Sequence, residues 1–167
     1  MLYLARSLSQ LHFGSLMAVY ADANRENGRI FWPEEPEMRQ IQLAEQDFYR
    51  YLSQVFFKTL GANYAVWEEN GRYVSALRLE PYRDGLLLEA LETAPAQRRK
   101  GYAAALVQAV QLSLRQSGSV RIYSHVDKRN LPSLKTHEKC GFRRAADYAV
   151  CIDGSINQKM YTLYWEA

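Results

Sequence analysis

The sequence predicts one α/β (α+β) domain with a mixed, mostly antiparallel sheet, and two observations carry this prediction. The first is the order of elements expected from the spacing of apolar residues: strand, two helices, three strands, helix, strand, helix and two strands. The second is a pair of hairpin signals, Asn70-Gly71 and Asp153-Gly154, which join neighbouring strands. With 167 residues, the chain has the size of a single domain that covers residues 1–167.

The N-terminal part predicts one strand followed by two helices. Residues 1–7 alternate enough for a strand, and apolar residues at helical spacing predict a helix from Ser9 or Gln10 to about Asn24. We expect a loop over residues 27–33. A second helix is expected from about Pro36 to Leu60, with Gly61 as its C-terminal cap.

After Gly61 the apolar period changes from that of helices to that of strands. Residues 64–67 and 73–79 flank the Asn-Gly turn, and residues 86–93 follow as a third strand. Residues 101–115 carry an apolar stripe typical of a helix, and residues 120–126 form a buried strand. The connection from the third strand through this helix to the buried strand predicts a right-handed parallel crossover.

The C-terminal part predicts a short helix and two strands. Asn130 is expected to cap the helix, which tolerates Pro132 in its first turn and ends at Gly141. The last strands are expected over residues 146–152 and 159–165. The sequence shows no repeat, linker or low-complexity segment.

Composition indicates an ordinary soluble protein with a small anionic ligand. The net charge is +3 without a long run of Lys or Arg, so a nucleic-acid partner is not expected. The chain has two cysteines, Cys140 and Cys151, which favours a reducing, cytoplasmic setting without disulfides. We expect no metal, because CxxC and HExxH are absent, and no membrane span.

A basic turn stands between the strand over residues 86–93 and the following helix. It contains Arg98, Arg99 and Lys100 and ends in Gly101. Backbone N–H groups at a helix start lack intrahelical partners and carry partial positive charge. Gly101 lets an anion approach the backbone, and Ala103 keeps the next facing position small. The turn therefore predicts a socket for a phosphate-bearing ligand.

These segments resemble the GNAT superfamily of N-acetyltransferases over nearly the whole chain. Residues 98–103 fit the family's acetyl-CoA pattern: Gln or Arg, two residues, Gly, one residue, then Gly or Ala. Residues 130–133 and 137–142 fit its second signature, an Asn, a helix and Gly-Phe. The resemblance implies a single domain with a six- to seven-stranded sheet, a splayed parallel strand pair and about four flanking helices.

The resemblance also implies an enzyme that transfers an acetyl group from acetyl-CoA to a primary amine of a small molecule, amino acid or peptide. Attack is direct, in a ternary complex, and no metal is needed. A monomer or homodimer in the cytoplasm is expected. The residues that would bind acetyl-CoA are Leu91, Glu92, Thr93, Arg98, Arg99, Lys100, Gly101, Tyr102, Ala103, Ala104, Asn130 and Ser133.

The catalytic candidates depart from the usual family pattern. Many relatives have a tyrosine acid in the helix before Gly-Phe, where this chain has His137. An imidazolium can donate a proton to the departing thiolate only if it is charged near neutral pH. The base candidates are His125 and Glu92, with Glu80 and Glu89 on neighbouring strands.

Alternative interpretations stay open at this point. The missing tyrosine is compatible with a non-catalytic acyl-CoA-binding or sensing module of the same fold. A nucleic-acid-binding domain would need a cationic face well beyond residues 97–100. Taken alone, Asn130 can be a helix cap, His125 a core histidine, and the basic turn a solvated one.

Overall fold

The computed structural model describes residues 1–118 and 120–167. Within these residues, a seven-stranded sheet has the order β1-β2-β3-β4-β5-β9-β6, and a separate ribbon has the order β7-β8. Strands β4 and β5 pair parallel, and the other neighbours pair antiparallel. The predicted mixed, mostly antiparallel sheet with one parallel pair is confirmed.

The element bounds follow the predicted order with local exceptions. The strands are β1 (Leu2–Ala5), β2 (Asn63–Glu69), β3 (Arg72–Tyr82), β4 (Gly85–Thr93), β5 (Arg121–Asp127), β6 (Arg143–Ala146), β7 (Ala149–Val150), β8 (Ile156–Asn157) and β9 (Met160–Glu166). The α-helices are α1 (Phe13–Val19), α2 (Ala21–Phe31), α3 (Glu37–Gln54), α4 (Tyr102–Gln116) and α5 (Leu131–Lys139). Short 3-10 turns are η1 (Leu8–Gln10), η2 (Phe56–Lys58) and η3 (Pro95–Gln97).

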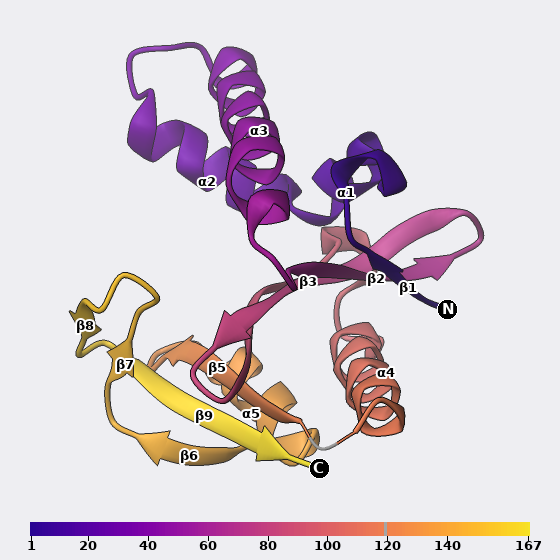
Figure 1. Cartoon of the computed structure of the whole chain (residues 1–167). Coiled ribbons are helices and arrows are strands. Elements are labelled where there is room, and N and C mark those ends of the chain that lie inside the picture. Colours follow the sequence, from indigo (N-terminus) through magenta and orange to yellow (C-terminus); the bar gives the residue numbers. More distant parts are fainter. Residues whose placement is uncertain (119) are drawn as a thin grey trace.

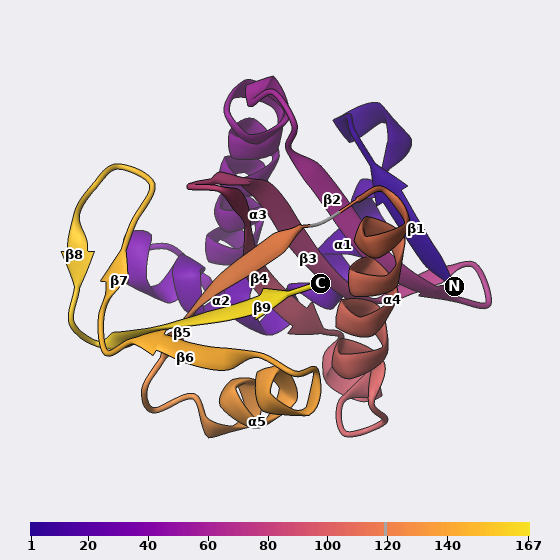
Figure 2. The same cartoon turned by 60° about the horizontal axis from the view of Figure 1, so that its bottom comes forward.

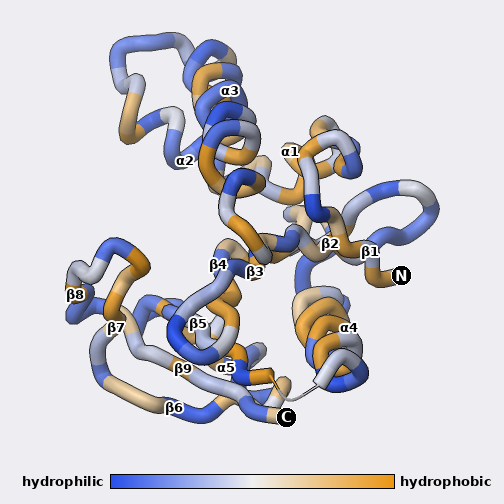
Figure 3. Tube along the Cα trace, in the orientation of Figure 1, coloured by the Kyte–Doolittle hydropathy of each residue, from blue (hydrophilic) through white to orange (hydrophobic). Residues whose placement is uncertain are grey.

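Helices cover both faces of the sheet. Helices α1 to α3 lie on one face and α4 and α5 on the other (Figure 1). Apolar residues are concentrated along α4 and the central strands, whereas α2 and α3 carry long polar stretches (Figure 3). Under α4 the core includes Leu77, Leu88, Leu106 and Ile122, and the core under α1 and α3 centres on the ring of Phe56.

The turn residues behave as their chemistry predicts. Asn70 and Gly71 have φ values of 52° and 73°, as the first hairpin requires. Asn130 caps α5, because its side chain accepts a hydrogen bond from the Ser133 N–H at 3.2 Å. These positions therefore locate the element boundaries correctly.

The predicted helix over residues 9–24 is wrong in its bounds. The chain forms η1 and α1, changes direction at Tyr20, and continues as α2 to Phe31, so much of the loop expected over residues 27–33 is helical. Tyr20 is buried and its hydroxyl donates to the Ala90 carbonyl at 2.7 Å. This bond ties α1 to the sheet, while α2 turns away to pack on α3.

Two further boundaries differ from the prediction. Helix α3 ends at Gln54, and η2 separates it from Gly61, which has φ +85° but does not cap the helix. The strand expected over residues 146–152 is interrupted: β6 pairs with β9, whereas β7 leaves the sheet to pair with β8. The β7–β8 ribbon projects beyond the sheet (Figure 2).

Gly28 provides a test of the α2–α3 packing. A Cβ at this position would lie 2.8 Å from the carbonyl oxygen of Gln40 in α3. We expect Gly28→Ala to lower the free energy of unfolding by about 1–2 kcal/mol, because the backbone of α3 would have to shift to relieve the overlap with the new methyl group. Urea denaturation measures the change.

Gly14→Ala is the matched control in α1, where the added Cβ would meet its nearest atom, His12 Cε1, at 3.5 Å. The better helix propensity of alanine should leave stability equal or raise it by up to about 1 kcal/mol. Equal effects of the two substitutions would contradict close helix packing at Gly28.

Candidate active site

The basic turn leads from β4 into α4 through two residues with left-handed backbone. Arg99 has φ 63° and Gly101, the N-cap of α4, has φ 86°. The first intrahelical bond of α4 runs from the Ala105 N–H to the Gly101 carbonyl at 3.0 Å. The preceding N–H groups of the helix therefore have no intrahelical partner, which is the arrangement that binds anions.

Gly101 leaves open space at this helix start. A Cβ built at the position would meet no atom within 4 Å, so the protein does not fill the space that a side chain would occupy. The positive φ disfavours any residue with a side chain. Space and backbone conformation together suit the close approach of a phosphate group.

The cations of the turn have different surroundings. Arg98 faces the protein: its Nη1 lies 2.7 Å from Asp22 Oδ2, and its Nε donates to the Thr93 carbonyl at 3.2 Å. Lys100 donates to the Gln97 amide oxygen at 2.8 Å. Arg99 and Lys100 are exposed. The turn thus presents cations to solvent while Arg98 connects it to α2 and β4.

Strands β4 and β5 part after a short paired segment. Their register pairs run from Leu86–Ile122 to Leu88–Ser124, although β4 continues to Thr93 and β5 to Asp127. A cavity of about 240 Å³ opens beyond the paired part. Its lining residues are Leu88, Glu89, Ala90, Leu91, Glu92, Ser124, His125, Val126, Asp127, Asn130, Ser133, His137 and Met160. We name it the strand cavity.

A second cavity, of about 270 Å³, lies between β4 and the N-terminal helices. Its lining residues are Tyr20, Ala23, Asn24, Asn27, Phe48, Arg78, Ala90 and Glu92. We name it the helix cavity. Ala90 and Glu92 belong to the linings of both cavities, so the two cavities adjoin the same part of β4. At this point β4 has a bulge: the register to β3 shifts, and Ala90 has φ 50°.

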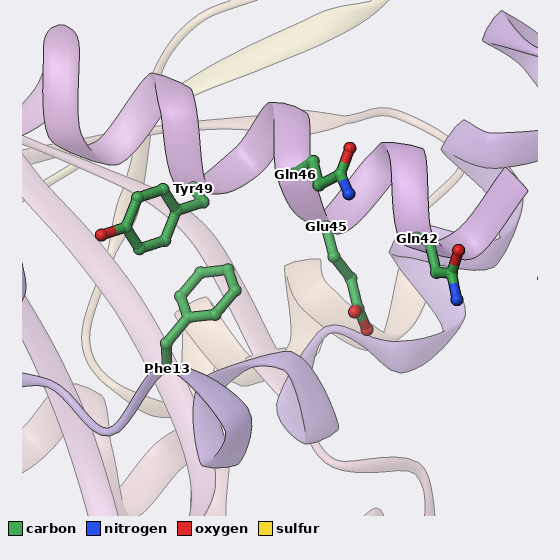
Figure 4. A pocket seen from close by; sticks show the side chains of 5 residues that line it. All are labelled: Phe13, Gln42, Glu45, Gln46 and Tyr49. Carbon is green, nitrogen blue, oxygen red and sulfur yellow. The ribbon is translucent and has the colours of Figure 1, made fainter. Parts of the chain in front are cut away.

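Another cavity, of about 330 Å³, lies between α1 and α3 and contains no residue of the predicted site. Figure 4 shows Phe13 facing Tyr49, with Gln42, Glu45 and Gln46 further along α3. The rings of Phe13 and Tyr49 pack edge to face with centroids 5.1 Å apart. Ring packing accounts for the apolar part of this lining.

His137 lies in the wall of the strand cavity and is 1% exposed. Burial lowers the pKa of His137 below its usual range, and the bond from Nδ1 to the Ser133 carbonyl opposes this shift only partly. That bond, 2.8 Å long, places the proton of the neutral ring on Nδ1. In this form Nε2 has no proton to give, so the environment does not favour the acid role predicted for His137.

His125 has the properties of a proton acceptor. It lines the strand cavity, and its buried Nε2 has no hydrogen-bond partner among the described residues. Burial lowers the pKa of His125, which favours the neutral ring at neutral pH. The ring packs edge to face on Tyr82, with centroids 5.4 Å apart.

The carboxyl groups of the site are also shifted in their ionisation. Burial raises the pKa of Glu92; the Arg98 guanidinium, 3.8 Å away, opposes this shift and Asp22 adds to it. Burial, a hydrogen bond with Glu89 and the charge of that carboxylate raise the pKa of Glu80 to about 7. Glu80 is therefore protonated to a large extent near neutral pH.

The structure brings part of the predicted site together. Leu91, Glu92, Asn130 and Ser133 line the strand cavity with both histidines, whereas Thr93 and the residues of the basic turn lie outside its lining. The sequence places an acceptor between the two N-terminal helices, the hairpin region and the last strands, but it gives no role to Asn24, Asn27 or Arg78, which line the helix cavity. The signal for this cavity was the charged Arg78 among the apolar residues of β3.

Comparisons with known proteins agree with this architecture. Residues 22–142 match the model of the acetyltransferase (GNAT) family, and the chain belongs to this family. A comparison with curated proteins finds no match.

Solved acetyltransferase structures share the fold over the whole chain. PaiA N-acetyltransferase from Thermoplasma acidophilum, in complex with coenzyme A, has TM-score 0.63 and 11% identity, covering 100% of this chain and 99% of that one. The ribosomal-protein-S18-alanine N-acetyltransferase from Escherichia coli has TM-score 0.58 and 16% identity, with coverages of 99% and 94%. Aminoglycoside 6'-acetyltransferase type Ii has TM-score 0.60 and 15% identity, with coverages of 99% and 96%.

Two further kinds of feature are absent from the described residues. None of the described helices has the length and apolarity that crossing a membrane requires. Likewise, no cluster of three or more His, Cys, Asp or Glu residues that could hold a metal ion occurs in residues 1–118 and 120–167.

Gly101→Val tests the anion site. The valine would occupy the open space at the helix start and strain the left-handed backbone, so we expect acetyl-CoA affinity to fall more than tenfold, about 1.4 kcal/mol or more. Isothermal calorimetry measures the affinity.

Gly71→Val is the matched control, because Gly71 has φ 73° and an added Cβ there would also meet nothing within 4 Å. It lies in the β2–β3 turn, away from both cavities. We expect a similar loss of stability with unchanged affinity. Unchanged acetyl-CoA affinity in Gly101→Val would contradict the placement of the diphosphate.

Proposed function

We propose that the protein transfers an acetyl group from acetyl-CoA to a primary amine within a ternary complex. The observation that carries this proposal is that two cavities adjoin the same part of β4, where Ala90 and Glu92 line both. One cavity can hold the end of a thioester and the other an acceptor, so the reactants meet beside a carboxyl group. A purely acyl-CoA-binding module would not need this second cavity.

Acetyl-CoA is assigned to the basic turn and the strand cavity. Its diphosphate would accept hydrogen bonds from the N–H groups at the start of α4, near Gly101. Its pantetheine arm would lie between β4 and β5 and bond the backbone of Leu91 to Thr93 as an added strand. Asn130 and Ser133 lie on the α5 side of that arm. The coenzyme A in the Thermoplasma neighbour supports this assignment.

The reaction needs a neutral amine and a stabilised oxyanion. Glu92, directly or through water, removes a proton from the ammonium group, and the amine then attacks the thioester carbonyl. An N–H group near Thr93 stabilises the oxyanion. The C–N bond forms, the nitrogen loses its second proton to the departing thiolate as the C–S bond breaks, and Glu92 releases the first proton to solvent. His125 is the second candidate for the base.

An amine panel tests the function directly. Purified protein is incubated with acetyl-CoA and primary amines, including amino acids and peptides, and free-thiol release is followed. We expect release that depends on the amine. Binding of acetyl-CoA without release for any amine would favour the non-catalytic module instead.

Glu92→Gln tests the base. We expect kcat to fall by about 10²–10⁴-fold, with little change in the KM for acetyl-CoA, because the amide cannot accept the proton. Since the pKa of Glu92 is raised, activity of the unchanged protein should be lost on acidification at a higher pH than about 4.3, the ordinary value for glutamate. The substitution should remove this acid limb.

The pH profile is measured as kcat with saturating acceptor of low pKa, so that titration of the amine does not mask the carboxyl group. Glu138→Gln, on the exposed side of α5, is the control and should leave the profile unchanged. An unchanged kcat in Glu92→Gln would transfer the base role to His125.

A further inference from the structure

Arg78 of β3 is a partly buried cation whose guanidinium makes no hydrogen bond to the described residues. Its side chain is 17% exposed, and its Nε is buried without a hydrogen-bond partner. The Glu89 carboxylate lies 3.6 Å from Nη2, beyond hydrogen-bond length. No hydrogen bond of this guanidinium is found among the described residues. A guanidinium has five N–H donors, and a donor that is shielded from water and has no acceptor lowers the stability of the protein.

Aromatic rings and charges account for the position of Arg78, but not for its donors. The guanidinium carbon lies 4.9 Å from the ring centroid of Tyr51 and 5.8 Å from that of Phe56. Such stacking holds the plane of the group and leaves its N–H edges free. Neither Glu80 nor Glu89 forms a hydrogen bond with the guanidinium, since the Glu89 carboxylate lies 3.6 Å from Nη2 and no bond to Glu80 is found among the described residues. The donors are therefore available to a ligand.

The helix cavity, which Arg78 lines, is also lined by the carboxyl group of Glu92. Arg78 and Glu92 both line it, and α2 adds the amides of Asn24 and Asn27. In the β3–β4 ladder, Ala76 is opposite Glu92 and Arg78 is opposite Glu89. Arg78 thus lies two residues along β3 from the level of Glu92, a distance of about 7 Å. The helix cavity is therefore lined by a guanidinium and a carboxyl group that belong to different levels of the β3–β4 ladder.

We propose that Arg78 binds the carboxylate of the acceptor and that the acceptor is a free amino acid, with its amine beside Glu92. This inference rests on the proposed function and names the acceptor class for the same site. Arginine binds carboxylates with paired N–H···O bonds of about 2.7–2.9 Å, which an incoming ligand can form and Glu89 does not. The amine then lies beside the part of β4 that both cavities adjoin.

Matched acceptors test the proposal without any substitution. Each set contains an amino acid, its amide and its decarboxylated amine, for example phenylalanine, phenylalaninamide and phenethylamine. We expect kcat/KM to be at least tenfold higher for the carboxylate than for either analogue in the sets that react best. Equal or faster acetylation of the amides and decarboxylated amines would overturn the proposal, whereas failure of every amine would overturn the proposed function itself.

Substitutions of Arg78 test whether this residue binds the carboxylate. Arg78→Gln should raise the KM for the amino acid at least tenfold and remove the preference over the amide, with an unchanged KM for acetyl-CoA. Arg78→Lys should restore part of the preference, because it keeps the charge and loses the paired geometry. Arg72→Gln, at the exposed start of β3, is the control and should change neither value.

A binding measurement covers the case in which Arg78→Gln does not fold. 3-Phenylpropionate, which has the carboxylate but no amine, should inhibit the unchanged protein competitively against phenylalanine. Absence of inhibition at concentrations well above the KM of phenylalanine would contradict a carboxylate site. An Arg78→Gln protein that folds and keeps the preference would assign the carboxylate to another residue and overturn the inference.

Discussion

The departure of β4 from β5 after Leu88 is the constraint on which the site depends. Up to that residue the strands pair normally, and the Ser124 hydroxyl donates to the Leu88 carbonyl at 3.2 Å. Beyond it, the bulge at Ala90 turns the strand, and residues of one short segment line both cavities. Continuous pairing would close the strand cavity, and no backbone N–H or C=O group of β4 would then be free to bond a ligand.

The bulge is strained and the N-terminal helices hold it. A residue with a side chain pays about 1–2 kcal/mol for left-handed backbone, and Ala90 has φ 50°. The Tyr20 hydroxyl donates to the Ala90 carbonyl at 2.7 Å and accepts from the Tyr64 hydroxyl at 2.8 Å. At about 1 kcal/mol for each bond, this chain is of the size needed to offset the strain. The break between α1 and α2 at Tyr20 therefore serves the geometry of β4.

Sequence reasoning succeeded where one or two residues determine the backbone. Asn70-Gly71, Asn130 and Gly101 each satisfy a local requirement, so they located a hairpin, a helix cap and the turn into α4. It failed where contacts between residues far apart in the sequence determine the structure. From the sequence, Gly28 indicates a loop; its close contact with the backbone of α3 shows why a glycine stands inside a helix here. Nothing near Arg78 in the sequence indicates which helices lie beside it. The helix cavity draws residues from four elements and from the α1–α2 junction, and its lining could not be predicted from spacing.

Arg98 shows how the two halves of the site are joined. The motif predicts that Arg98 of the basic turn contacts a phosphate, yet its guanidinium binds Asp22 of α2 and the Thr93 carbonyl at the end of β4. Both partners of the ion pair are 44% exposed, so solvent and salt screen it and it adds little stability. Its effect is geometric: it holds α2, which lines the helix cavity, against the turn that precedes α4. Under the proposed function, the anion is therefore assigned to the backbone N–H groups at the start of α4 and to the exposed Arg99 and Lys100.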